Sequence, residues 1–163
     1  MGNEVGSIPA EKLPKGWRFP NQAEVRDRGE RAVQISADFN GDGVHDEAIL
    51  LKSEESLEEG LWVWLSASNR TRQWINLDKI RSRASHANVP LAMAIDGIPP
   101  GTYALGCFNF VEGFELVEGC NPRTHRPKLT LDNLAIAYYG TGAASVYVWS
   151  KRHKRFQRVW SRD

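Results

Sequence analysis

The sequence lacks several features that would point directly to a class of protein. Its formal net charge is only +1, so a strong attraction to nucleic acid or to an anionic membrane is not indicated. No apolar run approaches the roughly 20 residues that a membrane helix requires. The motifs GxSxG, HExxH and CxxC are absent, and the four histidines lie far apart in the chain. These absences predict a protein that is not an enzyme, has no nucleic-acid partner and has no transmembrane segment.

Cysteine is also scarce, since the chain has only Cys107 and Cys120. The residues between them are typical of two short strands around a turn at Glu112-Gly113, which would bring the ends of a hairpin together. A disulfide across so short a loop would stabilise the fold by about 3 kcal/mol and would imply an oxidising compartment. The alternative is a pair of small buried thiols in a reduced protein. We predict the disulfide.

The length and composition predict one domain. The chain has 163 residues, of which 41% are hydrophobic and 25% are charged, and this is typical of a globular protein with a real core. Residues 1–16 are polar and contain Gly and Pro, so we predict a flexible N-terminal tether there. Residues 17–163 are predicted to form a single β domain, and we expect a monomer.

Short aromatic and β-branched runs between turn residues predict an all-β fold. We expect about nine to eleven short strands in an antiparallel sandwich, barrel or partial propeller. The exceptions are a short helix predicted over 78–85 and a solvated acidic loop predicted over 54–59. The alternation of Trp62 and Trp64 puts both on one sheet face, where Trp74 could join them. We expect a stacked aromatic core there, and an exposed recognition face is the alternative.

The segment 38–46 reads DFNGDGVHD and has oxygen-bearing side chains at its first, third, fifth and ninth positions. Calcium takes about six to eight oxygen ligands, and a chain can surround it only by turning sharply, which Gly43 permits. Three carboxylates within nine residues would repel one another without a cation. The alternative is a polar turn without an ion. The predicted calcium ligands are the side chains of Asp38, Asn40, Asp42 and Asp46 and the carbonyl of Val44.

This loop matches an EF-hand over its first nine positions only. The twelfth position is Ile49, whereas an EF-hand requires a bidentate Glu, and the flanking residues are typical of strands. The segment 35–50 instead resembles the calcium-loop signature of FG-GAP and VCBS repeats, in which a DxNGDGxxD loop joins two antiparallel strands. That resemblance implies a calcium-binding hairpin. The motif occurs once, so a propeller of several blades is not expected.

A basic segment near the C-terminus is the predicted partner-binding surface. Residues 151–155 are all basic and lie close in sequence to Tyr147 and Trp149, a combination that suits carbohydrate, nucleic acid or an acidic protein. The alternative is a charged turn that protects a sheet edge from aggregation. The glycine-rich hairpin at 140–145 and the irregular basic loop at 121–128 are the two loops that could insert into a partner. The residues predicted to contact a partner are Gly140, Thr141, Gly142, Lys151, Arg152 and His153.

As a whole, the chain is similar to single-loop VCBS-like domains of the bacterial periplasm. Some of these are similar to immunity proteins that inhibit peptidoglycan-degrading toxins by pushing a loop into the enzyme's cleft. The resemblance implies a calcium-binding, non-enzymatic immunity protein outside the cytoplasm. Its export signal would have been removed, and its precursor could carry a lipid anchor. Two alternatives stay open: a glycan- or adhesion-type binding module that uses the basic aromatic face, and a hydrolase whose site is not visible in the sequence.

Overall fold

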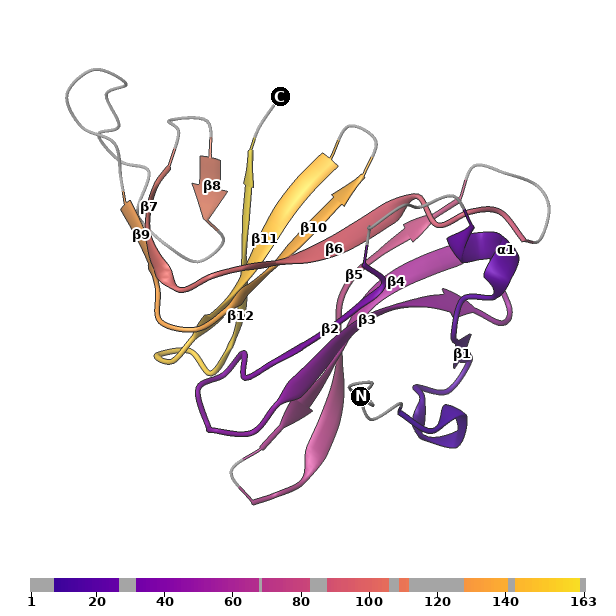
Figure 1. The fold of residues 1–163 in the computed structure, drawn as a ribbon, viewed down its shortest axis with the longest axis horizontal. Coiled ribbons are helices and arrows are strands. Elements are labelled where there is room, and N and C mark those ends of the chain that lie inside the picture. The colour runs from indigo at the N-terminus through magenta and orange to yellow at the C-terminus, as the bar shows by residue number, and fades with distance from the viewer. Residues whose placement is uncertain are drawn as a thin grey trace, which may run out of the picture.

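The computed structural model describes residues 8–26, 32–67, 69–82, 88–105, 109–111, 128–140 and 143–161. As predicted, these residues form a mostly β-structure of antiparallel strands (Figure 1). The strands of the first sheet follow the order β1-β3-β4-β5, and β2 also pairs with β3. Their bounds are β1 (Trp17–Arg18), β2 (Gln34–Ala37), β3 (Asp46–Ser53), β4 (Glu58–Ser66) and β5 (Arg72–Arg81).

The second sheet has the order β6-β10-β11-β12-β8. Its strands are β6 (Met93–Ile98), β8 (Asn109–Val111), β10 (Ala135–Gly140), β11 (Ala143–Ser150) and β12 (Arg155–Ser161).

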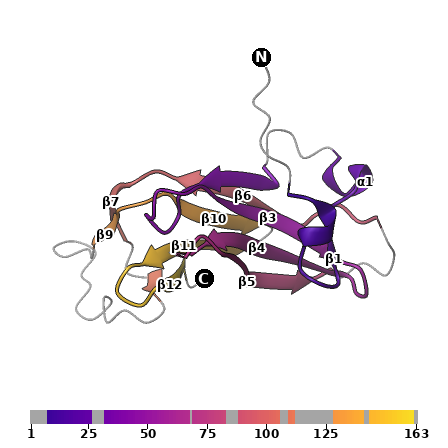
Figure 2. The ribbon, with the colours of Figure 1, turned by 90° about the horizontal axis from the view of Figure 1, so that it is seen from below.

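A small third sheet and two short helices complete the fold. The third sheet pairs β7 (Gly101–Ala104) with β9 (Lys128–Leu131), and the helices are η1 (Ala10–Lys12) and α1 (Gln22–Val25). The sheet β7–β9 and α1 lie at opposite ends of the molecule (Figure 2).

The main core lies between the first two sheets. Alternate residues of β4 point into it, and Leu61, Val63 and Leu65 are buried there, as the period of two in a strand requires. Ile136 and Tyr138 of β10 face them from the second sheet. The described strands do not close into a barrel, so the sandwich is the predicted architecture that the structure adopts.

The other face of the second sheet has a smaller core of its own. Leu129 and Leu131 of β9 pack there with Leu105, Ala135 and Val159. The small sheet β7–β9 therefore covers this face of the second sheet.

The tryptophans of the first sheet stack, but they do so on the face opposite the main core. The Trp64 and Trp74 rings are stacked with centroids 5.7 Å apart, and Trp62 meets Trp74 edge to face at 6.4 Å. These rings are half-buried. The N-terminal segment helps to cover them, because the Trp74 indole nitrogen donates a hydrogen bond to the Lys12 carbonyl at 2.7 Å.

Two sequence-based boundaries were wrong. The tether predicted over 1–16 is too long, because Ile8 is buried and residues 8–16 lie against the domain. The helix predicted over 78–85 was also wrong, because β5 continues through Arg81. Asp78 is a cross-strand neighbour of Leu61 and accepts a hydrogen bond from the Tyr147 hydroxyl at 2.7 Å, so tertiary pairing fixes this segment as a strand.

The acidic loop predicted over 54–59 is solvated only in part. β4 begins at Glu58, and Glu59 turns to the inner face of the sheet, where it is 1% exposed. Its carboxylate accepts hydrogen bonds from the amides of Ala92 and Met93, each at 2.9 Å. Glu59 is therefore part of the buried structure rather than of the loop.

Candidate functional site

Loop 38–46 joins the antiparallel strands β2 and β3, as the sequence predicted. The two strands meet at the Ala37–Asp46 pair. Gly41 and Gly43 have φ values of +76° and +84°, which lie in the left-handed region that glycine enters without a steric cost. The turn predicted at Gly43 is therefore present.

Asp38 organises the first half of this loop around its carboxylate. One oxygen accepts hydrogen bonds from the amides of Gly41 at 2.7 Å and Asp42 at 3.1 Å. The other oxygen accepts from the amide of Gly43 at 2.7 Å. The loop backbone thus closes around the side chain of its first residue.

Asp46 anchors the other end of the loop inside the protein. Its side chain is fully buried and accepts hydrogen bonds from the Phe39 amide at 3.0 Å and the Ser66 amide at 2.8 Å. Burial raises the pKa of Asp46 above its ordinary value, and the charge of Asp42 adds to this effect, although the donors on Phe39 and Ser66 oppose it. No basic side chain in the described part of the chain forms an ion pair with this carboxylate.

Asp42 and Asp46 meet at one hydroxyl group. The Ser66 Oγ lies 2.8 Å from Asp42 Oδ2 and 2.7 Å from Asp46 Oδ1. Burial is the largest single influence on the pKa of Asp42, and it raises that pKa. Hydrogen bonds from Ser66, Val44 and Asn40, together with the charge of Arg72, outweigh burial and hold the pKa below its ordinary value. A serine hydroxyl carries one proton, so it can donate to only one of these carboxylates at a time.

Asn40 and Val44 complete the set of predicted ligands. The Asn40 side chain donates to the Ser66 carbonyl at 2.9 Å and accepts from the Asp42 amide at 3.1 Å. The Val44 amide donates to Asp42 Oδ1 at 2.8 Å, and the Val44 residue is 46% exposed. Among the described residues, no group of three or more His, Cys, Asp or Glu side chains has the spacing of a metal site. Calcium binding therefore stays a prediction.

Arg72 supports the loop from β5, which lies beyond β4 in the same sheet. Its guanidinium donates to the His45 carbonyl at 2.8 Å and lies 4.9 Å from the centroid of the Trp64 ring. Arg72 is the cation whose charge acts on Asp42. It offsets part of the negative charge of the loop.

A pocket of about 410 Å³ lies between loop 38–46 and the basic turn 151–154. Asn40, Asp42 and Ser66 line one wall. The other wall consists of Trp149, Lys151 and Lys154, which belong to the end of β11 and the turn that leads to β12. Two regions that are more than 100 residues apart in the sequence therefore share one pocket.

The basic turn 151–154 is exposed throughout. Lys154 adopts a left-handed φ of +50°, which is uncommon for a residue with a Cβ. Lys151 lies 3.7 Å from the Asp132 carboxylate, but both side chains are more than half exposed, so this ion pair contributes little. Arg152 and His153 share the turn and do not line the pocket.

The other predicted partner-binding residues are separate from this pocket or outside the described residues. Gly140 ends β10, where it pairs with Ala143 and Met93. A Cβ at this position would lie 2.7 Å from the Ala92 carbonyl oxygen, so packing explains this glycine. Thr141 and Gly142 lie outside the described residues, as do Cys107 and Cys120, and the predicted disulfide is not tested.

Sequence reasoning missed Ser66, which lies 20 residues from Asp46 and meets it only because β3 pairs with β4. A local motif carries no signal for such a contact. Comparisons with protein-family models, with curated proteins and with solved structures found no match. Within the described ranges, no helix is long and apolar enough to cross a membrane.

Proposed function

We propose that this protein is a calcium-binding protein of the cell envelope that binds and inhibits a secreted peptidoglycan-degrading enzyme without turnover. The observation that carries this proposal is the shared pocket between loop 38–46 and the basic turn 151–154. A calcium ion in the loop would fix one wall of this pocket. A fixed binding surface loses less entropy when a partner binds.

The charges and hydrogen bonds of the loop fit a divalent cation. Asp38, Asp42 and Asp46 carry three negative charges within nine residues. The Ser66 hydroxyl lies within hydrogen-bond distance of both Asp42 and Asp46. It has one proton, so one of these two oxygen–oxygen contacts is made without a hydrogen bond from Ser66. Calcium would supply positive charge at this point, and hard oxygen donors are the ligands that it prefers.

The basic turn fits the cleft of an enzyme that cleaves glycosidic bonds. Such enzymes generally use a pair of carboxyl groups on either side of the bond that they cleave. The turn between β11 and β12 presents Lys151, Arg152, His153 and Lys154 to solvent. A turn with these side chains is complementary in charge to an acidic cleft, which favours fast and specific association.

The direct test is a binding measurement with peptidoglycan hydrolases, starting with any toxin encoded beside this protein. We expect a one-to-one complex in calcium that weakens in EDTA. The double variant Lys151→Glu/Lys154→Glu should bind at least about tenfold more weakly, and Lys128→Glu, at an exposed position of β9, is the matched control. Equal binding by the double variant and the control would contradict the proposed surface.

A second candidate is a glycan-binding module, because Trp149 lies in the pocket wall beside the two lysines. Aromatic rings and polar groups together suit sugar rings. A glycan array distinguishes the two candidates. The second function is favoured if a glycan binds saturably and competes with calcium-dependent binding of the hydrolase. It is also favoured if a glycan binds saturably and no hydrolase partner is found.

A further inference from the structure

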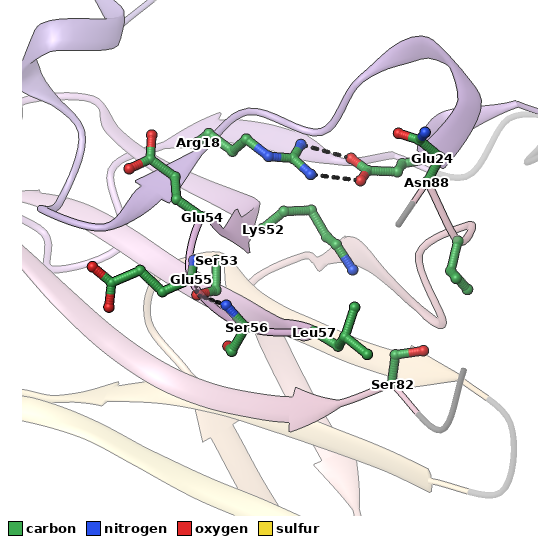
Figure 3. Close-up of a pocket in the computed structure, with 11 residues that line it drawn as sticks. Arg18, Glu24, Lys52, Ser53, Glu54, Glu55, Ser56, Leu57, Ser82 and Asn88 are labelled. Carbon is green, nitrogen blue, oxygen red and sulfur yellow. Dashed lines mark hydrogen bonds and ion pairs between the residues drawn. The ribbon is translucent and has the colours of Figure 1, made fainter. Parts of the chain in front are cut away.

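A second cavity lies at the opposite end of β3 from loop 38–46. It has a volume of about 280 Å³ and opens among β1, α1 and the segment between β3 and β4 (Figure 3). Asp46 begins β3 and Lys52 is next to its end, so a rise of about 3.3 Å per residue separates the two sites by about 20 Å. The cavity is therefore separate from the pocket described above.

Lys52 projects into this cavity from the inner face of β3. Only 5% of the residue is exposed, and Figure 3 shows its side chain extending below the ion pair of Arg18 and Glu24. In the part of the chain that the structure describes, the Lys52 ammonium forms no hydrogen bond or ion pair. Among the described residues, the Lys52 Nζ is not one of the buried side-chain nitrogens that lack a hydrogen-bond partner, so it reaches the open space of the cavity. There its three donors can take acceptor atoms from a bound molecule.

The nearby carboxylates already have partners. Glu24 is fully buried and accepts two hydrogen bonds from Arg18, at 2.9 and 2.7 Å, and one from the Asn21 amide at 2.9 Å. Glu59 lies opposite Lys52 in the register of β3 and β4 but is bonded to the amides of Ala92 and Met93. Neither carboxylate satisfies the lysine directly.

The overall charge around the cavity argues against an anionic ligand. Glu54 and Glu55 also line it, and in Figure 3 their carboxylates extend away from the Lys52 ammonium. With Glu24 they make three negative charges in the lining against the two positive charges of Arg18 and Lys52. This surplus repels an anion, and the Lys52 ammonium, which has no ion-pair partner among the described residues, repels a cation.

The remaining polar groups favour hydroxyl groups. The Ser53 hydroxyl oxygen accepts from the amides of Glu55 and Ser56, at 3.3 and 3.2 Å, so its proton is free to point elsewhere. Asn88 accepts from Asn21 at 2.6 Å through its side-chain oxygen, and its amide nitrogen can donate. Leu57 and Val89 add apolar surface. A hydroxyl both donates and accepts and carries no charge, so it can satisfy lysine and carboxylate alike.

We infer that this cavity is a binding site for a neutral polyhydroxylated molecule of about the size of one sugar ring. Lys52 would donate to its hydroxyl oxygens, and Ser53 and Asn88 would contact it from the rim. The volume lies near the lower end of ligand pockets, so a single ring fits this site better than a longer chain. This site is independent of calcium and of the proposed inhibitory surface.

The test is an NMR titration of the full chain in EDTA with glucose, N-acetylglucosamine and sodium acetate as probes. We expect saturable shifts of the Ser53, Ser56 and Asn88 amides with at least one sugar, and none with acetate. Lys52→Met should weaken sugar binding at least about tenfold, while Lys79→Met, at an exposed position of β5, should leave it unchanged. If Lys52→Met does not fold, Ser53→Ala provides the same comparison with a smaller expected loss.

Three results would overturn the inference. These are the absence of saturable shifts with both sugars, acetate binding that equals sugar binding, and sugar binding that is unchanged in both Lys52→Met and Ser53→Ala. The first of these would leave ordered water as the group that satisfies Lys52. Because the titration is carried out in EDTA, its outcome is independent of whether loop 38–46 binds calcium.

Discussion

Ser66 donates its backbone amide to Asp46 Oδ1 at 2.8 Å, and its hydroxyl oxygen lies 2.7 Å from the same atom. This double contact ties the end of β4 to the start of β3 at the base of loop 38–46. It holds Asp46, which is the most buried of the predicted calcium ligands, between the loop and the sheet. The first sheet therefore holds the loop in place from two neighbouring strands.

Replacing Ser66 by alanine should destabilise the protein in EDTA. The variant keeps the amide contact but removes the hydroxyl that Asp42 and Asp46 share, and the loss of such hydrogen bonds costs about 1–2 kcal/mol. Urea unfolding measures the difference in the free energy of unfolding. Ser36→Ala, at an exposed position of β2, is the control, and equal stability of the two variants would contradict the bridging role of Ser66.

Glu24→Gln should destabilise the protein at neutral pH. Glu24 is fully buried, while Arg18 keeps 36% of its side-chain surface exposed. Removing one partner of a buried ion pair costs about 3–5 kcal/mol, and we expect the lower end because Arg18 can be hydrated. Denaturant unfolding at pH 7 provides the measurement, with the exposed Glu55→Gln as the matched control. A loss no larger than that of the control would contradict the account.

The effect of Glu24→Gln should depend on pH. Burial alone raises the pKa of Glu24, but hydrogen bonds from Arg18 and Asn21 and the charges of Arg18 and Lys52 together hold it below its ordinary value of 4.5. A carboxyl with a lowered pKa stabilises the fold above its unfolded-state pKa, and this stabilisation is lost as the pH falls through its folded-state pKa. The stability difference between wild type and variant should therefore shrink on acidification below pH 4.5. A stability difference between wild type and Glu24→Gln that stays constant until the protein unfolds in acid would contradict the lowered pKa of Glu24.

Gly140→Ala should destabilise the second sheet. An added Cβ would lie 2.7 Å from the Ala92 carbonyl oxygen and would also overlap the Met93 sulfur. Overpacking of this kind costs about 1–3 kcal/mol. Thermal unfolding of this variant, compared with Ala144→Ser at an exposed position of β11, measures the effect. An unchanged melting temperature would contradict the close packing of Gly140 against Ala92.

Cys107 and Cys120 are expected to form a disulfide in protein purified without reductant. Intact mass before and after reduction decides between the disulfide and two thiols. If the bridge is present, Cys107→Ser should lower the free energy of unfolding by about 3 kcal/mol. Two free thiols in the unreduced wild-type protein would contradict the prediction and remove one argument for an oxidising compartment.

The features that the sequence predicted correctly depend on residues close together in the chain. The strand pattern and the position of Trp62 and Trp64 on one face of the sheet follow from alternation within β4, although these rings lie outside the main core in which they were expected. The turn at Gly43 follows from a short motif and from the backbone angles that only glycine adopts easily. Each of these is a local property, so a single sequence contains it.

The features that were missed depend on contacts between distant strands. Glu59 was expected in a solvated loop, but its carboxylate is buried because it accepts hydrogen bonds from the amides of Ala92 and Met93, 33 and 34 residues away in the chain. Lys52 faces Glu59 only through the register of β3 and β4. The pocket between Asp42 and Lys154 needs both sheets in place. Strand pairing that brings such residues together cannot be read from local patterns.

Isothermal titration of calcium into the folded protein tests the central claim most directly. We predict one bound ion with a dissociation constant of about 10⁻⁴–10⁻³ M, because the loop lacks a bidentate twelfth ligand, and much weaker binding of magnesium. Asp42→Ala removes an exposed side chain and should abolish binding while the protein stays folded, whereas Asp96→Ala, at an exposed position of β6, should bind as wild type does. Absence of calcium uptake by the folded wild-type protein at millimolar calcium would contradict the account.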